Sequence, residues 1–336
     1  MLLSTAFWLV ASLVALAVLP RGMAAPVAKM SLQLLWFLAC YTLTLLAAPT
    51  LARAAHTRPA FTTGVLVGSV VVVDVLAVGL DLPGVGLLNF MLVWCLPFTL
   101  GPLYAEGRFR GRPALIAALV AFGVNVALVA LGPYELSLVT VSGQRLSNMS
   151  PPTVVLALHA VVLCGLAGAA RGPLSALLTR PRVWWAVTVT NLSAMTIYLW
   201  HLPVLIAGLG VAGALGWERP GPGEPHFWSA SFALLAVFLL ATAAVVRLLW
   251  PTEHAPLPWW DAPAGERQGK PAPAALVALA GSAVGVGTLL VAKDGLAGLS
   301  RDGAMTWPAL AAVAAGLVAC RTLARLPPPL AGLRPR

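Results

Sequence analysis

Long apolar runs separated by short polar segments extend over almost the whole chain. A window of bilayer length finds about ten of them, since each spans enough residues to cross a hydrocarbon core as an α-helix. They lie at about residues 2–20, 31–50, 63–80, 86–104, 113–132, 152–170, 186–210, 228–249, 274–292 and 304–323. The pattern predicts an all-α integral membrane protein with about ten transmembrane helices.

The composition supports this prediction. The 336 residues are 60% hydrophobic and 10% charged, with a mean hydropathy of +0.89. This is too little polar surface to cover a water-soluble globule of the same size. The formal charge of +10 does not indicate a nucleic-acid partner, because the basic residues lie in short loops and build no continuous patch.

The loops differ in charge, and the difference predicts the topology. An even number of helices places both termini on one side of the membrane. The segments after every second run carry most of the basic residues, namely Arg53, Arg58, Arg108, Arg110, Arg112, Arg171, Arg180, Arg182, Arg247, Arg267, Lys270, Arg321, Arg325, Arg334 and Arg336. The opposite side has only Arg21, Lys29, Arg145, Arg219, Lys293 and Arg301. The positive-inside rule therefore predicts that both termini are cytoplasmic.

Three segments are more polar than the runs around them. Two longer outer loops, at 133–152 and 216–228, suit either a lid over a cavity or plain connectors. The Pro- and charge-rich stretch 251–273 is typical of a cytoplasmic linker. It separates residues 1–250 from a two-helix C-terminal membrane appendage with a basic tail at 274–336.

Few strongly polar residues fall inside the predicted helices. A carboxylate such as Asp74 must there be neutral, paired or close to water, so it indicates either a function or a buried structural pair. His159 suits a packing role better than a catalytic one. Asn89 and Asn125 are typical of hydrogen bonds between membrane helices.

The stretch NLSAMTIYLWHLPVL (191–205) places His201 within an apolar segment that is long enough to span the bilayer. An ionisable residue at that depth usually has a function. Tyr198 and Trp200 stand beside it, and Pro203 removes a backbone hydrogen bond from the helix.

These residues leave two classes of function open. Buried His and Asp side chains suit a proton-coupled transporter as well as a general base. The absence of regularly placed charges, of a repeat and of paired broken helices weakens the transporter interpretation without removing it. No glycine-rich phosphate loop or metal-ligand cluster is present, so we expect no bound cofactor and no metal.

Four motifs together resemble the acyltransferase-3 family of bacterial multi-spanning membrane O-acyltransferases. They are LLWFLACYTLTLLAAP (34–49), LNFMLVWCLPFTLGPLYAEGR (88–108), SNMSPPT (147–153) and AMTIYLWHLP (194–203), in the order of the family. The resemblance covers roughly residues 30–250. It implies a multi-pass protein of the bacterial plasma (inner) membrane, surrounded by the lipid bilayer.

The resemblance also implies a reaction. Such enzymes move an acyl group from a cytoplasmic acyl-thioester, with acyl-CoA as the expected co-substrate, to a hydroxyl of a sugar or glycosylated lipid or metabolite. O-acetylation is one example. A histidine takes the hydroxyl proton, while a cation or hydrogen-bond donor stabilises the oxyanion or the phosphates of the donor.

One signature of the family does not match. The family has an arginine about three helical turns before a catalytic histidine in its first helix, but no histidine here has an arginine eleven positions upstream. The WFL motif lies on the second run instead of the fourth. The first two helices of the family core are therefore expected to be missing. Three explanations are open: the sequence begins at a late start codon, the chain is a natural truncation without activity, or another histidine serves as the base. A late start is the interpretation we favour.

If the chain is active as given, His201 is the first choice for the base. Its alternative role is to tie helices together or to orient a substrate. Asp74 and His159 are the other catalytic candidates. The predicted substrate-binding residues are Trp36, Asn89, Asn148, Tyr198 and Trp200. The aromatic rings suit stacking on a sugar or acyl chain, but also packing. The alternative function is a non-enzymatic transporter or scaffold derived from the same membrane fold.

Overall fold

The computed structural model describes most of the chain, and its regular secondary structure is helical. It describes Phe7, Val10, Leu32 and residues 34–141, 143–144, 146–218, 220–255, 274–294 and 307–323. Within these ranges there is no β-strand, and the one isolated bridge joins Met149 to Pro152. The predicted all-α class is confirmed.

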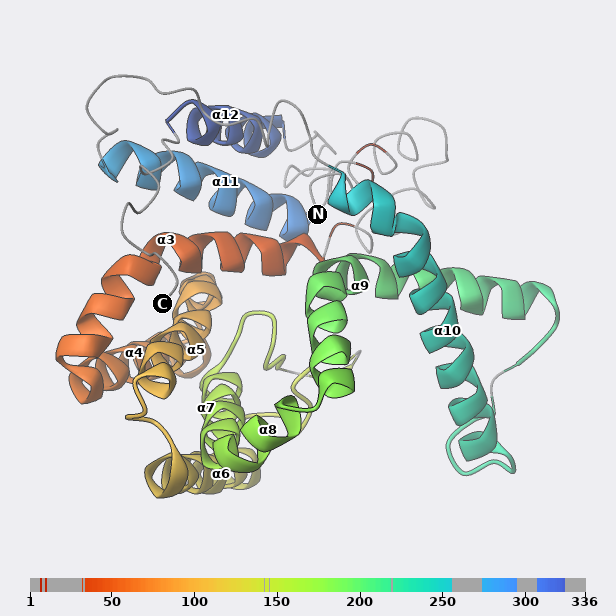
Figure 1. Ribbon diagram of the computed structural model, residues 1–336, viewed down its shortest axis with the longest axis horizontal. Coiled ribbons are helices and arrows are strands. Elements are labelled where there is room, and N and C mark those ends of the chain that lie inside the picture. Colours follow the sequence, from red (N-terminus) through yellow and green to blue (C-terminus); the bar gives the residue numbers. More distant parts are fainter. Residues whose placement is uncertain are drawn as a thin grey trace. The chain divides into compact units, whose positions relative to one another are not determined.

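The helices follow the apolar runs (Figure 1). They are α3 (Leu35–Thr57), α4 (Pro59–Asp74), the π-helix η1 (Val75–Gly79), the 3-10 helix η2 (Pro83–Leu88), α5 (Asn89–Ala105), α6 (Gly111–Leu131), α7 (Val154–Ala169), α8 (Arg171–Leu178), α9 (Pro181–Ala214), α10 (Phe227–His254), α11 (Ala274–Asp294) and α12 (Trp307–Leu323). Each predicted run from residue 31 onward coincides with a helix. Of the first run, 2–20, the structure describes only Phe7 and Val10.

Most of these helices suit a membrane. In the described part of the chain, 7 helices are long and apolar enough to cross one, or up to 8 if α7 and α8, which are bent by 65°, form one span. α12 is apolar but shorter. The protein is therefore a multi-pass membrane protein.

The contacts divide the chain into two compact units. Unit 1 contains Met1–Ala39 and Trp185–Arg336, and unit 2 contains Cys40–Trp184. The boundaries between the units fall inside α3, after Ala39, and inside α9, after Trp184. Each of these two helices therefore contributes residues to both units.

Unit 2 is built around α4, α5 and α7. Their buried side chains form one apolar cluster, with Val70, Leu96 and Ala157 among its most buried members. A second, smaller cluster of Ala55, Leu100 and Leu103 lies where α3 meets the end of α5. These clusters set the positions of the helix ends that carry polar groups.

Small residues let α6 and α7 approach closely. A Cβ added to Gly165 of α7 would lie 2.6 Å from the carbonyl oxygen of Ala114 and 2.9 Å from Cβ of Ala118. A Cβ on Gly168 would lie 2.8 Å from the carbonyl of Phe109. Membrane helices use such small residues because van der Waals contact replaces the hydrophobic effect as the force that holds them together.

In unit 1, glycines likewise let α11 and α12 approach closely. A Cβ on Gly287 would lie 2.8 Å from the carbonyl of Ala309, and one on Gly316 would lie 2.7 Å from that of Ala280. The helix pair also contributes Val291 and Ala309 to a buried apolar cluster that contains Leu35 and Leu199. The two C-terminal helices thus pack on residues of the WFL and YLWH motifs.

The close approach of α6 and α7 generates a prediction. Gly165→Ala inserts a methyl group against backbone, so we expect it to lower the free energy of unfolding by about 1–3 kcal/mol. Gly123→Ala on α6 is the matched control, because nothing lies within 4 Å of its Cβ position. Unfolding in detergent measures both variants, and equal stabilities would contradict the packing described.

Candidate functional site

Asp74 accepts hydrogen bonds from three different parts of unit 2. It is the last residue of α4 and is 3% exposed. Its Oδ1 accepts from Nδ2 of Asn89 at 3.0 Å. Its Oδ2 accepts from the hydroxyl of Tyr134 at 3.1 Å and from the backbone N–H of Val154 at 2.6 Å. We call these four residues the Asp74 joint.

Local structure explains why these donors are available. Val154 is the first residue of α7, where a backbone N–H has no acceptor inside the helix. The positive end of the helix dipole also favours a carboxylate at this place. Asn89 begins α5, and Tyr134 lies just beyond the end of α6. The Asp74 joint therefore holds together the adjoining ends of α4, α5 and α7.

Asn148 organises the outer loop beside this joint. Its side chain is fully buried, and its Nδ2 donates to the carbonyls of Glu135 at 2.6 Å and Ser137 at 3.0 Å. Its Oδ1 accepts from the hydroxyl of Thr153 at 2.8 Å. Because Thr153 is the N-cap of α7, the loop that the sequence places at 133–152 is fastened to the start of that helix.

The polar groups at the Asp74 joint differ in how well they are satisfied. Burial raises the pKa of the Tyr134 phenol, and the Asp74 carboxylate adds to this, so Tyr134 remains a donor. Asn89 is fully buried, and its Oδ1 has no hydrogen-bond partner among the described residues. One acceptor atom at the Asp74 joint is thus unused.

The YLWH motif lies in unit 1, on α9. The hydroxyl of Tyr198 donates to the carbonyl of Leu34 at 2.9 Å. The ring of Tyr198 lies 5.0 Å from that of Phe37 and 5.8 Å from that of His201, measured between centroids. Trp36 and Trp200 are half-buried against the apolar cluster of this unit. The four predicted residues Trp36, Tyr198, Trp200 and His201 therefore lie in one cluster.

His201 has one ring nitrogen engaged. Its Nδ1 lies 2.6 Å from the carbonyl oxygen of Tyr198, one turn earlier in the helix. A carbonyl only accepts, so Nδ1 carries the proton and, in the neutral ring, Nε2 has the lone pair. Pro203 lies inside α9 and cannot donate to the carbonyl of Leu199. The half-buried imidazole thus has the tautomer that a proton acceptor at Nε2 requires.

His159 is apart from the Asp74 joint. It is half-buried on α7, and its side chain makes no hydrogen bond to a described residue. One turn earlier, the carbonyl of Val155 accepts from Nδ2 of Asn125 at 3.2 Å. The asparagine therefore joins α6 to α7, the role expected of it.

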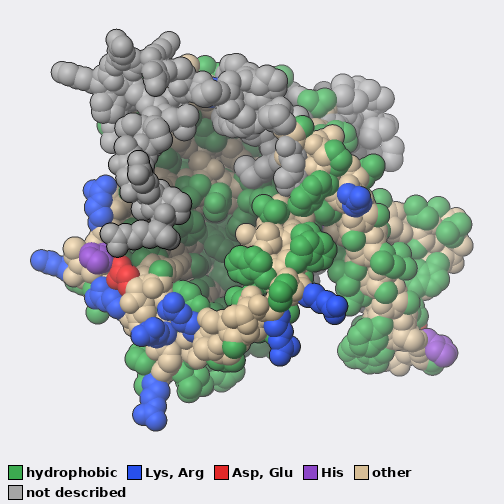
Figure 2. All heavy atoms as spheres, viewed as in Figure 1, with side chains coloured by type: hydrophobic (Ala, Val, Ile, Leu, Met, Phe, Trp, Pro, Cys, Tyr) green, Lys and Arg blue, Asp and Glu red, His purple; other side chains and the backbone are tan. Residues whose placement is uncertain are grey.

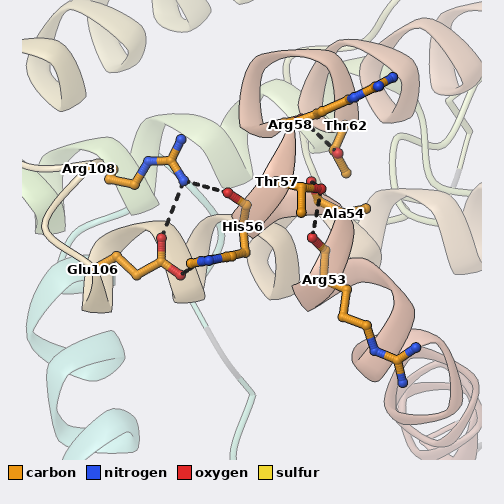
Figure 3. Close-up of polar contacts among 8 residues, drawn as sticks. All are labelled: Arg53, Ala54, His56, Thr57, Arg58, Thr62, Glu106 and Arg108. Atoms are coloured by element: carbon orange, nitrogen blue, oxygen red, sulfur yellow. Dashed lines mark hydrogen bonds and ion pairs between the residues drawn. The ribbon is translucent and has the colours of Figure 1, made fainter.

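Sequence reasoning did not find the cluster of His56, Glu106 and Arg108 (Figure 3). Nδ1 of His56 lies 2.8 Å from Oε1 of Glu106. Nη1 of Arg108 donates to the carbonyl of His56 at 2.8 Å and lies 3.4 Å from Oε2 of Glu106. The hydrogen bond from His56 holds the pKa of the Glu106 carboxyl below its usual range, and Arg108 acts in the same direction. In the sequence, the one indication of this cluster is that Glu106 is a single acidic residue among many arginines.

The predicted site residues fall into separate groups in the structure. Asp74 and Asn89 are hydrogen-bonded to each other, and Asn148 holds the loop beside them. Tyr134, which the sequence did not single out, completes that group. In the described part of the chain, no three His, Cys, Asp or Glu side chains gather as metal ligands.

Comparison with known proteins identifies a family for this chain. The acyltransferase-3 family model, described as an acyltransferase domain, matches residues 1–250. This range contains both the Asp74 joint and the YLWH motif, and it ends before α11. No curated protein and no solved structure matches the chain.

The Asp74 joint generates a prediction about stability. Asp74→Ala leaves three donors without their acceptor, two of them buried, so we expect a loss of about 2–4 kcal/mol in the free energy of unfolding. Tyr134→Phe removes one hydrogen bond and is expected to cost about 1 kcal/mol. A double-mutant cycle in detergent measures their coupling. Additivity within about 0.3 kcal/mol would mean that the two side chains do not interact.

Proposed function

Because the chain belongs to the acyltransferase-3 family and is a membrane acyltransferase, we propose that it is an O-acyltransferase that uses an acyl-thioester. The donor is acyl-CoA, and the acceptor is a hydroxyl of a sugar or of a glycosylated lipid or metabolite. The observation that supports this is the family match over residues 1–250. In this proposal the enzyme lies in a bacterial inner membrane with both termini in the cytoplasm, where the donor is available.

His201 is the proposed proton acceptor. Its Nε2 takes the proton of the acceptor hydroxyl as that oxygen attacks the thioester carbonyl. The C–S bond then breaks, and the leaving thiolate takes the proton back from the imidazolium. The contact of Nδ1 with the Tyr198 carbonyl supports this role, because it fixes the ring and its tautomer.

Aromatic side chains supply the proposed binding surface for the acceptor. Trp36, Tyr198 and Trp200 lie in the same cluster as His201, and such rings stack on the apolar faces of sugars or contact an acyl chain. In unit 2, we assign a structural role to Asp74, Asn89 and Asn148. Their hydrogen bonds hold the loop 133–152, which is predicted to lie on the outer side. Both carboxylate oxygens of Asp74 already accept hydrogen bonds, which favours His201 over Asp74 as the base.

Proteoliposomes that contain the purified chain test this function. Labelled acyl-CoA and a glycolipid extract should give a labelled ester, beyond the hydrolysis seen without protein. His201→Ala should lower the rate by about 10²-fold or more, as expected for loss of a general base. Thin-layer chromatography with mass spectrometry measures the product.

His159→Ala is the matched control, because it removes another half-buried helical histidine of the matched range. We expect it to retain most of the activity. A wild-type chain that forms no ester would contradict the proposed function. An unchanged rate in His201→Ala would leave the function standing and contradict the assignment of the base.

A further inference from the structure

One end of unit 2 collects basic side chains. Contacts between helices show which residues share this end: His56 with Glu106, Arg108 with the carbonyl of His56, and Arg171 with the carbonyl of Tyr104. The arginines at this end are Arg53, Arg58, Arg108, Arg110, Arg112 and Arg171. We call this set the basic end. In Figure 2, basic side chains gather along one edge of the face that is drawn.

Two of these arginines are used within the protein. Nη1 of Arg171 donates to the carbonyl of Tyr104 at 2.9 Å, and its guanidinium lies 4.8 Å from the centroid of that ring. Arg108 binds the carbonyl of His56 and lies against Glu106. Glu106 is the one acid described at this end, and it is already paired with His56 and Arg108. The remaining charge is therefore uncompensated.

Four arginines remain available for a ligand. Arg53, Arg58, Arg110 and Arg112 are exposed, and their guanidinium groups make no hydrogen bond or ion pair with a described residue. Figure 3 shows the side chains of Arg53 and Arg58 extending away from the Glu106 carboxylate. An arginine fork binds phosphate oxygens through two parallel hydrogen bonds.

The loop that carries Arg110 and Arg112 is held in shape. Gly107 and Gly111 have φ values of 77° and 61°, which favour glycine. Between them, Phe109 packs against the small apolar cluster of Ala55, Leu100 and Leu103. This anchor presents the two arginines at the end of the spanning helices.

Helix α8 gives independent evidence for a lipid surface. It is bent by 65° from α7, so it does not continue the direction of that helix. Leu174, Leu177 and Leu178 lie on one side of it at helical spacing, and the first two are 42% and 41% exposed. Arg171 precedes them and Arg180 follows. A short amphipathic helix of this kind suits the plane of a membrane interface.

We propose that the basic end binds the phosphate groups of acidic phospholipids, with α8 as its interfacial helix. The position at the ends of spanning helices favours a lipid over a soluble polyanion. At the opposite end of unit 2, the described residues include the acids Asp81 and Glu135 and no arginine. The attraction is therefore specific to one leaflet, the one predicted to face the cytoplasm. This inference is independent of the acyl-transfer reaction.

Native mass spectrometry of the full chain in detergent tests the proposal independently of membrane insertion. Titration with phosphatidylglycerol and with phosphatidylcholine should show tighter binding of phosphatidylglycerol, and the difference should shrink as salt rises. A combined Arg53→Gln, Arg58→Gln, Arg110→Gln and Arg112→Gln variant should lose about tenfold or more in affinity, since one arginine near an anionic surface is worth about fivefold.

The same four positions changed to lysine are the matched control, because lysine keeps the charge. This variant should stay within about threefold of the wild type, and a thermal unfolding curve checks that both variants are folded. Equal binding of the two lipids, or an unchanged affinity in a folded glutamine variant, would overturn the proposal. Displacement of phosphatidylglycerol by an equal concentration of free coenzyme A would also overturn it, by identifying a site for soluble phosphates.

Discussion

A buried carboxylate at the end of a membrane helix is the constraint around which unit 2 is arranged. Water cannot solvate Asp74, which is 3% exposed, so the protein must supply its hydrogen bonds. It does so from the start of α5, from the start of α7 and from the outer loop. Because these groups belong to separate segments, one side chain fixes the relative positions of all three.

Because Asp74 fixes the start of α7, it also affects the positions of the segments that pack against α7. Gly165 and Gly168 bring α6 into close contact with α7, and Arg171, just beyond α7, binds the carbonyl of Tyr104 near the end of α5. At that end, His56, Glu106 and Arg108 join α3 to the turn that follows α5. Unit 2 thus has a polar joint at each end of its helices and an apolar interior between them. Asp74 and its partners lie at one end, and most arginines lie at the other end together with Glu106.

The sequence predicted the helices well because the length of an apolar run is a local signal. It also singled out Asp74 and Asn89 as polar residues inside predicted helices, Asn148 as a substrate-binding candidate, and the WFL and YLWH motifs as parts of a family pattern. It did not predict α8, because a helix of 8 residues is too short for a window of bilayer length. The donor from Val154 is a backbone group, and no residue type reveals it. His56 and Glu106 are 50 positions apart, so their contact depends on how α3 packs against α5.

In the proposed function, Asp74 holds the fold, whereas Nε2 of His201 accepts the proton of the substrate. This divides the polar side chains between structure and chemistry. Amide hydrogen exchange at Val154 tests this division most directly, because its N–H bonds to Asp74 across 80 positions of sequence. We predict slow exchange in the wild type and fast exchange in Asp74→Ala, with the amide of Val162, in the middle of α7, slow in both. Unchanged exchange at Val154 in Asp74→Ala would show that Asp74 does not hold α7 and would contradict the account.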